Sequence, residues 1–227
     1  MRVLDLFSGL GGFSKPFADR GHEVTTLDMN PSFWPDIKAN LMRLAVDDPR
    51  VQGFDVILAS PPCETFSVAR IAKNWVSPGV PRSDAARSAI ELVRHTLAMI
   101  DRAAPRFWVM ENPNGMLKTV IGPPIAVITL CQYGAKWQKP TCLWGRFPPG
   151  AIRPRCSPGA SCHEAAPRGS GSGVQGVRDP AERARMPYGL GEALCITMEA
   201  DSLVPIVSGL PDTGTDGPGI NHEKTYR

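Results

Sequence analysis

The stretch DVILASPPCETFS, residues Asp55 to Ser67, decides the fold of this chain. Its apolar run Val56–Ala59 is short and rich in β-branched residues, which predicts a buried strand of a parallel sheet. Pro61-Pro62 ends this strand abruptly, so we expect Cys63 to be held stiffly at its carboxyl end. Ligands and reacting groups of open α/β sheets gather at that edge, which favours a chemical role for the thiol. A buried structural cysteine is the alternative, because free cysteine is among the most buried residue types.

The composition is that of an ordinary globular protein. The 227 residues are 42% hydrophobic and 21% charged, enough for one main core with a small appendage. No apolar run approaches the ~20 residues that a membrane helix needs, and MRVLDLFSG at the N-terminus has no signal-peptide core. We therefore expect a cytoplasmic protein with no membrane contact. The six cysteines are irregularly spaced, which favours thiols or a metal over a disulfide framework.

Apolar strand candidates alternate with helical or loop segments along the chain. The clearest helix is expected from about Ser83 to Ala103, with Ser83 as its N-cap and an apolar stripe along one face. This alternation predicts an α/β fold with a doubly wound, mostly parallel sheet. The expected strands are Val3–Leu6, Glu23–Leu27, Phe54–Ala59, Phe107–Met110 and Ile125–Cys131.

The composition changes after the last expected strand. From Ser157 to Pro180, 12 of 24 residues are Gly, Ser or Pro, and no hydrophobic period remains. We expect a catalytic and ligand-binding α/β domain at 1–144 and a small loop-rich insert at 145–183. A C-terminal helix at 184–207 should return to the α/β domain, and 208–227 should form a flexible tail.

Positive charge gathers in and around this insert. Residues 136–185 contain nine Lys or Arg against three acids, Glu164, Asp179 and Glu182, whereas the whole chain has a net charge of only +3. A local excess of this kind is typical of a surface that faces phosphates. A solvated basic loop is the alternative.

The first expected strand leads into a glycine-rich turn. In VLDLFSGLGGFS, Asp5 lies near the strand's end, and Gly9, Gly11 and Gly12 follow it. Backbone amides in such a turn can approach a ligand at a helix N-terminus, although the spacing is not the G-x-G-x-x-G of a dinucleotide fold. The second strand ends at Asp28, a place from which an acid can accept hydrogen bonds from a ribose diol. Together these features indicate an adenosyl ligand.

A carboxyl and an amide follow another expected strand. In WVMENPNG, Glu111 and Asn112 come directly after the strand Phe107–Met110. The carboxyl ends of parallel strands meet at one edge of a sheet, so these side chains should emerge at the same edge as Cys63. The sequence therefore predicts a single crevice that contains a thiol, a carboxyl and an adenosyl site.

Taken in order, these motifs resemble those of the cytosine-C5 DNA methyltransferases. DLFSGLGGFS, PPCETFS and ENP are similar to the first, fourth and sixth family motifs, and QYGAKWQKPT and RMPYGLGEAL to the eighth and tenth. The similarity spans about residues 2–195, and the compact chain resembles small phage-type members of the family. It implies a sheet of the S-adenosylmethionine-dependent methyltransferase type, S-adenosylmethionine as methyl donor, and a cytosine flipped out of double-stranded DNA.

The resemblance also implies roles for individual residues. The catalytic set is Cys63, Glu111, Asn112 and Pro62. The residues against the methyl donor are Asp5, Phe7, Gly9, Gly11, Gly12, Asp28, Met29, Asn40 and Pro61. The residues against DNA are Ser67, Lys136, Lys139, Arg153, Arg155 and Arg168.

The chain departs from the family pattern at four places. The family usually has Gln-Gly after PPC and Val after Glu-Asn, where this chain has Glu64-Thr65 and Pro113. The family usually has an Asp after the third strand, and the corresponding residue here is the amide Asn40.

The eighth motif differs most. The family's Gln-x-Arg-x-Arg falls on Gln132, Gly134 and Lys136, so one of its two cations keeps its place, and Lys139 is a further basic residue nearby. Which residue would meet the cytosine O2 therefore stays open.

The chemistry of cytosine gives the PPC turn its expected purpose. Carbon 5 of cytosine is a poor nucleophile, so a thiolate must first add to carbon 6 before carbon 5 can attack a sulfonium methyl. Cys63 is the expected nucleophile, and Glu111 is expected to protonate N3. Asn112 is expected to brace the turn that holds the sulfur in place.

Two other functions stay open. The same chemistry acting on RNA or on a free cytosine nucleotide is one, because the insert is short and RNA is recognised mostly in unpaired segments. A module that binds DNA and the donor without turnover is the other, because the eighth motif is altered.

We expect a monomer in which the insert recognises a short DNA site. So small an element can reach few base edges, and most of its arginines should contact phosphates. These arginines are Arg146, Arg153, Arg155, Arg168, Arg178 and Arg183, with Arg185 just beyond.

The insert also contains RCSPGASCHEA, with Cys156, Cys162 and His163. The spacing of the two cysteines is unusual for zinc, and the adjacent Cys162 and His163 should have difficulty reaching one tetrahedral ion. We therefore expect ordinary thiols in a mobile loop, and no metal.

Overall fold

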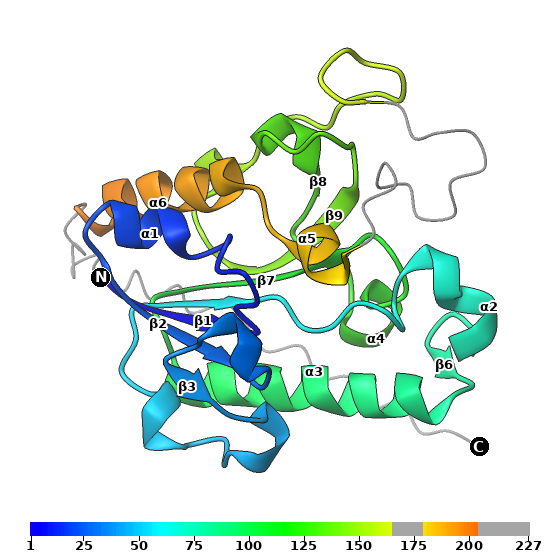
Figure 1. Ribbon diagram of the computed structural model, residues 1–227, viewed down its shortest axis with the longest axis horizontal. Coiled ribbons are helices and arrows are strands. Elements are labelled where there is room, and N and C mark those ends of the chain that lie inside the picture. Colours follow the sequence, from blue (N-terminus) through cyan, green and yellow to red (C-terminus); the bar gives the residue numbers. More distant parts are fainter. Residues whose placement is uncertain (165–178, 204–227) are drawn as a thin grey trace, which may run out of the picture.

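The computed structural model describes residues 1–164 and 179–203, which form an α/β domain around one seven-stranded sheet (Figure 1). The strand order is β3-β2-β1-β4-β7-β9-β8. Neighbouring strands pair in parallel except β7 with β9 and β8 with β9, so within the sheet β9 runs against the others. The strands are β1 (Arg2–Leu6), β2 (Glu23–Asp28), β3 (Ile37–Lys38), β4 (Val56–Ala59), β7 (Phe107–Pro113), β8 (Ala126–Thr129) and β9 (Pro140–Arg146).

Helices cover both faces of this sheet. The long helix α3 (Asp84–Ala103) packs on one face, and α1 (Lys15–Asp19) and α6 (Tyr188–Ser202) lie together on the other (Figure 1). A hairpin of β5 (Trp75–Ser77) and β6 (Val80–Pro81) stands apart from the sheet. The short helices are α2 (Ile71–Asn74), α4 (Lys118–Ile121) and α5 (Pro180–Ala184), and the 3-10 turns are η1 (Pro31–Phe33), η2 (Leu41–Arg43), η3 (Pro49–Val51), η4 (Val68–Arg70), η5 (Leu130–Tyr133) and η6 (Pro149–Ala151).

The four residues of β4 supply two cores at once. Ile57 and Ala59 join the core on the α3 side of the sheet, whereas Val56 and Leu58 join the core beneath α1 and α6. Successive side chains of a strand point to opposite faces, and here both faces are covered. The continuous apolar run in the sequence follows from this double burial, and it confirms the doubly wound, mostly parallel sheet that the sequence predicts.

The helix α3 begins where the sequence predicts it. Ser83 is the N-cap, and its hydroxyl oxygen accepts a hydrogen bond from Ala86 N at 3.1 Å. Ile90, Val93 and Ile100 on one stripe of the helix are buried in the core against the sheet. Ala104 ends the helix in a left-handed conformation.

The strand β9 is the main element that the sequence pattern does not predict. It continues to Arg146, two residues past the expected boundary at 144. Its presence also lengthens β7, because Glu111 and Asn112 pair with Leu143 and Cys142 of β9. Glu111 and Asn112 therefore lie within a strand instead of following one.

The C-terminal helix is shorter than expected. It begins at Tyr188 rather than at 184, because Pro187 has no backbone N–H and restricts the residue before it. The expected tail at 208–227 lies outside the described residues. In 145–164 and 179–183, the described parts of the insert, we find the end of β9, the turn η6 and most of α5.

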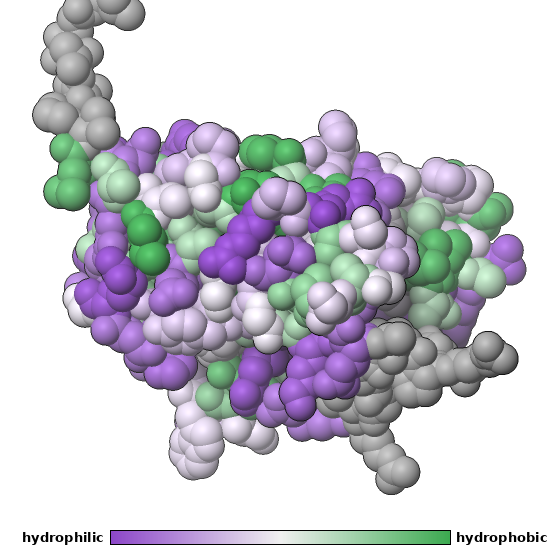
Figure 2. Space-filling view, turned by 90° about the horizontal axis from the view of Figure 1, so that it is seen from above, coloured by the Kyte–Doolittle hydropathy of each residue, from purple (hydrophilic) through white to green (hydrophobic). Residues whose placement is uncertain are grey.

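Within the two described ranges, no helix combines the length and the apolar character that crossing a bilayer requires. On the face drawn in Figure 2, hydrophilic and hydrophobic side chains are interspersed. This mixture is normal for a protein surface in contact with water.

A glycine sets how closely α6 approaches the start of α1. A Cβ atom at Gly191 would lie 2.3 Å from Phe13 O and 2.9 Å from Pro16 Cγ, closer than such atoms approach in proteins. We expect Gly191→Ala to lower the free energy of unfolding by about 1–3 kcal/mol, measured by urea denaturation. Ile196→Ala, on the exposed side of the same helix, should change it by less than about 0.5 kcal/mol. A Gly191→Ala protein as stable as its parent would contradict this close packing.

Candidate active site

A cleft of about 670 Å³ opens at the carboxyl ends of the parallel strands β1, β2 and β4. It lies where the chain connections turn in opposite directions from β1, the position at which open α/β sheets bind ligands. Its volume falls within the range of about 300–1,000 Å³ that is usual for small-molecule sites.

The structure brings most of the predicted site residues to this cleft. The predicted residues that line it are Asp5, Phe7, Gly9, Gly12, Asp28, Met29, Asn40, Pro61, Pro62, Cys63, Glu111 and Lys139. Gly11 and Asn112 do not line the cleft, although their chain neighbours Gly12 and Glu111 do. Ser67, Lys136, Arg153 and Arg155 do not line the cleft, and Arg168 lies outside the described residues.

The turn after β1 is tied to the neighbouring strand. Phe7 has a left-handed backbone with a φ of +62°, which is uncommon for a residue with a large side chain. The backbone amides of Phe7 and Ser8 both donate to Leu27 O, at 2.9 and 3.2 Å, and these bonds hold the turn in place. Gly11 N closes the turn by donating to Ser8 O at 2.8 Å. Gly9 therefore meets the cleft as part of a fixed backbone.

Gly12 brings a distant part of the chain to the cleft. A Cβ atom there would lie 2.5 Å from Met186 O, so only glycine allows this contact. The segment that packs against Gly12 forms a wall of the cleft that the sequence did not predict. The residues of this wall are Asp179, Pro180, Ala181, Ala184, Arg185 and Met186. The motif RMPYGLGEAL, which begins with Arg185 and Met186, was the sequence signal for part of this wall.

The carboxylate of Asp28 is oriented by two backbone amides. Gly9 N donates to Asp28 Oδ2 at 3.0 Å, and Asn30 N donates to Asp28 Oδ1 at 2.8 Å. An ionised carboxylate has about four acceptor positions. Each oxygen therefore keeps a position with which to accept a hydroxyl group of a ligand.

Two other predicted ligand residues already have partners within the protein. The buried carboxylate of Asp5 accepts a hydrogen bond of 2.6 Å from Ser14 Oγ, which fastens β1 to the start of α1. Burial raises the pKa of Asp5 to about 7. Asn40 Oδ1 accepts from Met42 N at 3.0 Å and caps η2. Both residues line the cleft as parts of its scaffold.

The turn that carries Cys63 is held from both sides. Asn112 Nδ2 donates to Pro61 O at 3.0 Å, and both residues are buried. On the other side, Phe66 N and Ser67 N donate to Cys63 O at 3.1 and 3.0 Å. The backbone of Cys63 is therefore fixed before any substrate arrives. Ser67, which was predicted to contact DNA, contributes to this turn.

Glu111 is a buried acid with an unused oxygen. It is 4% exposed, and within the described residues its Oε1 has no hydrogen-bond partner. Buried polar atoms are nearly always paired, so an unpaired carboxyl oxygen facing a cleft indicates a ligand. Burial raises the pKa of Glu111, and the nearby Lys139 acts against that shift.

The same surroundings keep the thiol of Cys63 protonated. Burial, and then the negative charge of Glu111, raise the pKa of Cys63 to about 11, while Lys139 again acts in the opposite direction. The two titrations are coupled, because a proton on Glu111 removes the charge that disfavours the thiolate.

Lys139 is the cation of the eighth motif that reaches the cleft. Its Nζ donates to Arg183 O at 3.3 Å, and the charge acts on both Cys63 and Glu111. Lys136 is exposed and does not line the cleft. Of the two lysines that the sequence left open, the geometry favours Lys139 as the one that meets a substrate.

Two arginines predicted for DNA contact have structural partners. Arg146 Nε donates to Arg106 O at 2.8 Å, and the same side chain also donates to Pro105 O. Because β9 runs against β7, Arg146 pairs with Trp108 at the edge of the sheet opposite the cleft. The guanidinium of Arg153 lies 5.1 Å from the centre of the Tyr133 ring, whereas Arg155 is exposed.

Comparison with known proteins gives a consistent result. Residues 1–129 match the family model of the C-5 cytosine-specific DNA methylases. A protein of Frog virus 3 (isolate Goorha) named "Probable DNA (cytosine-5)-methyltransferase" is 31% identical over 171 residues, which cover 71% of this chain and 78% of the viral protein. Type II methyltransferase M1.HphI of Haemophilus parahaemolyticus is 29% identical over 128 residues, and type II methyltransferase M.NgoPII of Neisseria gonorrhoeae is 27% identical over 127. These matches cover 49% and 52% of this chain but only 32% and 34% of the bacterial proteins.

The doubly wound sheet and the family match define a protein with the fold of the S-adenosylmethionine-dependent methyltransferases. More specifically, this chain belongs to the C-5 cytosine-specific DNA methylase family, because the family model covers more than half of its 227 residues. The matched range contains the glycine turn, the PPC turn and the Glu111-Asn112 pair. The family that the sequence motifs predict is thereby confirmed.

Glu111→Gln should make Cys63 more reactive toward alkylation. The change removes the negative charge that helps to raise the pKa of Cys63, so the thiolate fraction at about pH 8 increases, about tenfold for each unit by which the pKa falls. The measurement is the rate of iodoacetamide labelling at Cys63, resolved from the other cysteines by peptide mass spectrometry. Glu64→Gln is the matched control, because the exposed Glu64 acts on the thiol more weakly. An unchanged rate in Glu111→Gln would contradict the coupling.

Proposed function

We propose that this protein transfers a methyl group from S-adenosylmethionine to carbon 5 of cytosine in double-stranded DNA. One observation carries the proposal: the cleft holds a braced thiol, Cys63, beside a buried acid, Glu111, whose Oε1 has no partner among the described residues. Family membership supports cytosine as the substrate, and the names of the relatives support DNA.

The methyl donor would bind at the glycine turn. S-adenosylmethionine, when bound, supplies an electrophilic methyl group on a sulfonium. Asp28 would accept hydrogen bonds from its ribose hydroxyls, since each carboxylate oxygen keeps an acceptor position. Phe7, Met29 and Asn40 would enclose the rest of the donor. A cleft of about 670 Å³ is large enough for a ligand of this class.

Cys63 would begin the reaction on the base. The thiol would first lose its proton to solvent. The thiolate would then form a bond to carbon 6 of cytosine, and the electron pair of the ring double bond would move so that carbon 5 becomes nucleophilic. Glu111 donates its proton to N3, which stabilises the charge that addition creates. Carbon 5 would then take the methyl group, and the electron pair of the broken bond would stay on the sulfur of the donor, which leaves as a neutral thioether. The original proton of carbon 5 would pass to a solvent base. The Cys63 sulfur then leaves carbon 6 as a thiolate, and N3 returns its proton to Glu111.

A proton on Glu111 serves both the protonation of N3 and the addition of the Cys63 thiolate. A protonated Glu111 is the acid that N3 requires, and the same proton removes the repulsion that raises the pKa of Cys63. Lys139 further favours the thiolate, because its positive charge acts against the rise in that pKa. The positioning residues Asn112 and Pro62 keep the sulfur where a flipped cytosine would meet it.

The insert at 145–183 would contribute to target recognition. In its described part, Arg155 is exposed, and the exposed Lys136 lies just outside it. Such side chains suit phosphate contacts, which position a duplex without selecting its sequence. We expect a monomer that recognises a short site, because an element of this size offers few contacts to base edges.

Cys63→Ser should abolish methyl transfer and leave donor binding intact, since a hydroxyl is a far weaker nucleophile than a thiolate. Transfer of a radiolabelled methyl group to duplex DNA measures activity, and calorimetry measures donor affinity, which should stay within about twofold of the parent. Cys195→Ala is the control, because this buried thiol lies outside the cleft.

The substrates in that assay should be duplex DNA, single-stranded DNA, transfer RNA and a free cytosine nucleotide. Methylation of duplex DNA by the parent supports the proposal, and a preference for RNA or nucleotide would overturn it. Donor binding without transfer to any substrate would indicate a binding module. A Cys63→Ser protein with near-parent activity would exclude the thiol mechanism.

Asp28→Ala should weaken donor binding. Loss of hydrogen bonds to a charged acceptor costs roughly 1.5–3 kcal/mol, or about a 10- to 150-fold increase in Kd. Asp48→Ala is the matched control, because Asp48 also accepts a backbone hydrogen bond, from Arg50 N, but lies outside the cleft. If calorimetry gives the two variants equal affinities, Asp28 does not contact the donor.

A further inference from the structure

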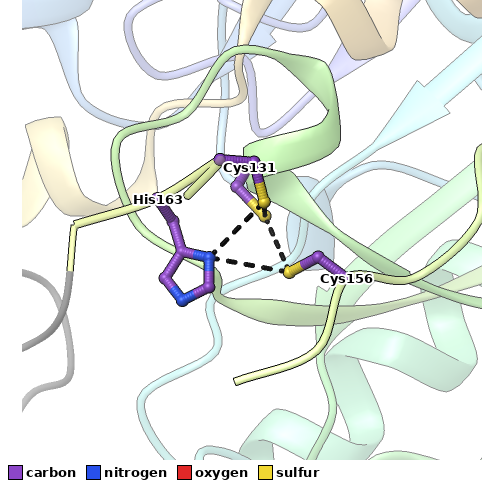
Figure 3. A group of neighbouring side chains, drawn as sticks. Cys131, Cys156 and His163 are labelled. Atoms are coloured by element: carbon purple, nitrogen blue, oxygen red, sulfur yellow. Dashed lines mark hydrogen bonds between the residues drawn. The ribbon is translucent and has the colours of Figure 1, made fainter. Parts of the chain in front are cut away.

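Four side chains that can bind metal meet where the insert joins the sheet, outside the cleft. Cys131 comes from η5, and Cys156, Cys162 and His163 come from the loop that follows η6. Their sulfur atoms and one imidazole nitrogen all lie within 4.8 Å of one another. Figure 3 shows the side chains of Cys131, Cys156 and His163 pointing toward a common centre. Cys131 precedes the other three by 25 residues or more, so folding brings this set together.

Three distances between ligand atoms in this cluster match those between the ligands of a tetrahedral zinc ion. Cys162 Sγ lies 3.8 Å from Cys131 Sγ and 3.6 Å from His163 Nδ1. Cys156 Sγ lies 3.7 Å from His163 Nδ1. With Zn–S bonds of about 2.3 Å and Zn–N bonds of about 2.0–2.1 Å, a tetrahedron separates two sulfurs by about 3.8 Å and a sulfur from a nitrogen by about 3.6 Å. The pair Cys131–Cys156, at 3.1 Å, is shorter, and a small side-chain rotation would open it.

The geometry contradicts the expectation that Cys162 and His163 have difficulty reaching one ion. The chain bends through residues 161–163, and this bend turns the two adjacent side chains to the same side. The spacing of Cys156 and Cys162 is unusual for zinc, but it is compatible with a metal site here because the fourth ligand, Cys131, comes from a different element. Sequence spacing alone could not reveal that ligand.

Neighbouring amides donate to the sulfurs. Gln138 Nε2 donates to Cys156 Sγ at 3.2 Å, and Gln132 Nε2 donates to Cys162 Sγ at 3.4 Å. Outer partners of this kind orient the ligands of a metal and stabilise thiolate charge.

The loop that supplies three of the ligands has no apolar core of its own. From residue 153 to residue 164, none of the side chains is buried. Polar contacts such as Glu164 N to Lys136 O, at 2.7 Å, hold its ends. Small segments that cannot bury enough apolar surface are commonly held by a disulfide or a metal.

A second group of potential ligands, His22, Cys195 and Glu199, is better explained as an ion pair. Glu199 accepts hydrogen bonds from both Arg20 Nε and His22 Nε2. The guanidinium of Arg20 already neutralises this carboxylate and would repel a cation.

We propose that Cys131, Cys156, Cys162 and His163 bind one Zn²⁺ in a structural site that fastens the insert to the α/β domain. A set of three cysteines and one histidine fills all four positions of a tetrahedral zinc, which is typical of structural sites and leaves no position for a substrate. Binding releases the thiol protons and involves no change in oxidation state.

The test is the metal content of the full-length, tag-free protein, purified with a thiol reductant and analysed by inductively coupled plasma mass spectrometry. We expect about one zinc per chain in the parent and less than about a tenth of that in Cys162→Ser. Cys162 is exposed, so its replacement leaves the core unchanged. Cys195→Ser is the matched control, and it should keep its zinc. Loss of zinc from this variant alone would assign the metal to His22, Cys195 and Glu199 and overturn the proposal.

A second measurement does not depend on metal recovery. A zinc chelator should lower the melting temperature of the parent and of Cys195→Ser, but not that of Cys162→Ser, because only a bound metal adds stability that a chelator can remove. Zinc retained in Cys162→Ser, or a reduced parent without zinc and with an unaltered melting temperature, would overturn the proposal. So would a disulfide between Cys131 and Cys156 in the reduced, freshly purified parent.

Discussion

The buried hydrogen bond from Asn112 Nδ2 to Pro61 O joins the two strands that carry the reactive groups. Cys63 follows β4, and Glu111 lies in β7, so the relation between thiol and acid depends on how these strands are fixed to each other. Parallel pairing sets their register, and the side chain of Asn112 extends that pairing past the end of β4, where the two prolines remove backbone donors. Asn112 is itself held in register by β9. The sheet thus determines the position of the sulfur as well as the fold.

Much of this architecture could be predicted from the sequence, because it depends on local patterns. The continuous apolar run of β4 reflects burial on both faces, and Ser83 marks the start of α3 through its capping hydroxyl. β9 escaped prediction because Pro140 begins it and Gly145 lies near its end, both residues that are unusual in strands, and because one of its two partners, β7, is distant in sequence. The C-terminal wall of the cleft and the place of Cys131 beside Cys156 are tertiary contacts, which no periodicity records.

Burial gives the cleft its distinctive electrostatics. Asp5, Cys63 and Glu111 all have raised pKa values, and in each case loss of solvation is the largest cause. Burial of this kind favours the protonated form of each group, and a neighbouring positive charge opposes it. Lys139 is the cation whose charge acts on both Cys63 and Glu111. The altered eighth motif therefore still places a positive charge beside the thiol and the acid, although from a different position in the chain than the family pattern suggests.

The contact between Gly12 and Met186 O has a consequence for biosynthesis. Cys63, Glu111 and the glycine turn leave the ribosome well before the segment that closes their cleft. Until that segment is made, one wall of the cleft is missing, and the desolvation of the thiol and the acid is incomplete. Enclosure comes only when residues 179–186 pack against the glycine turn. A product that terminated before residue 179 would hold Cys63 and Glu111 and still lack the surroundings that adjust their chemistry.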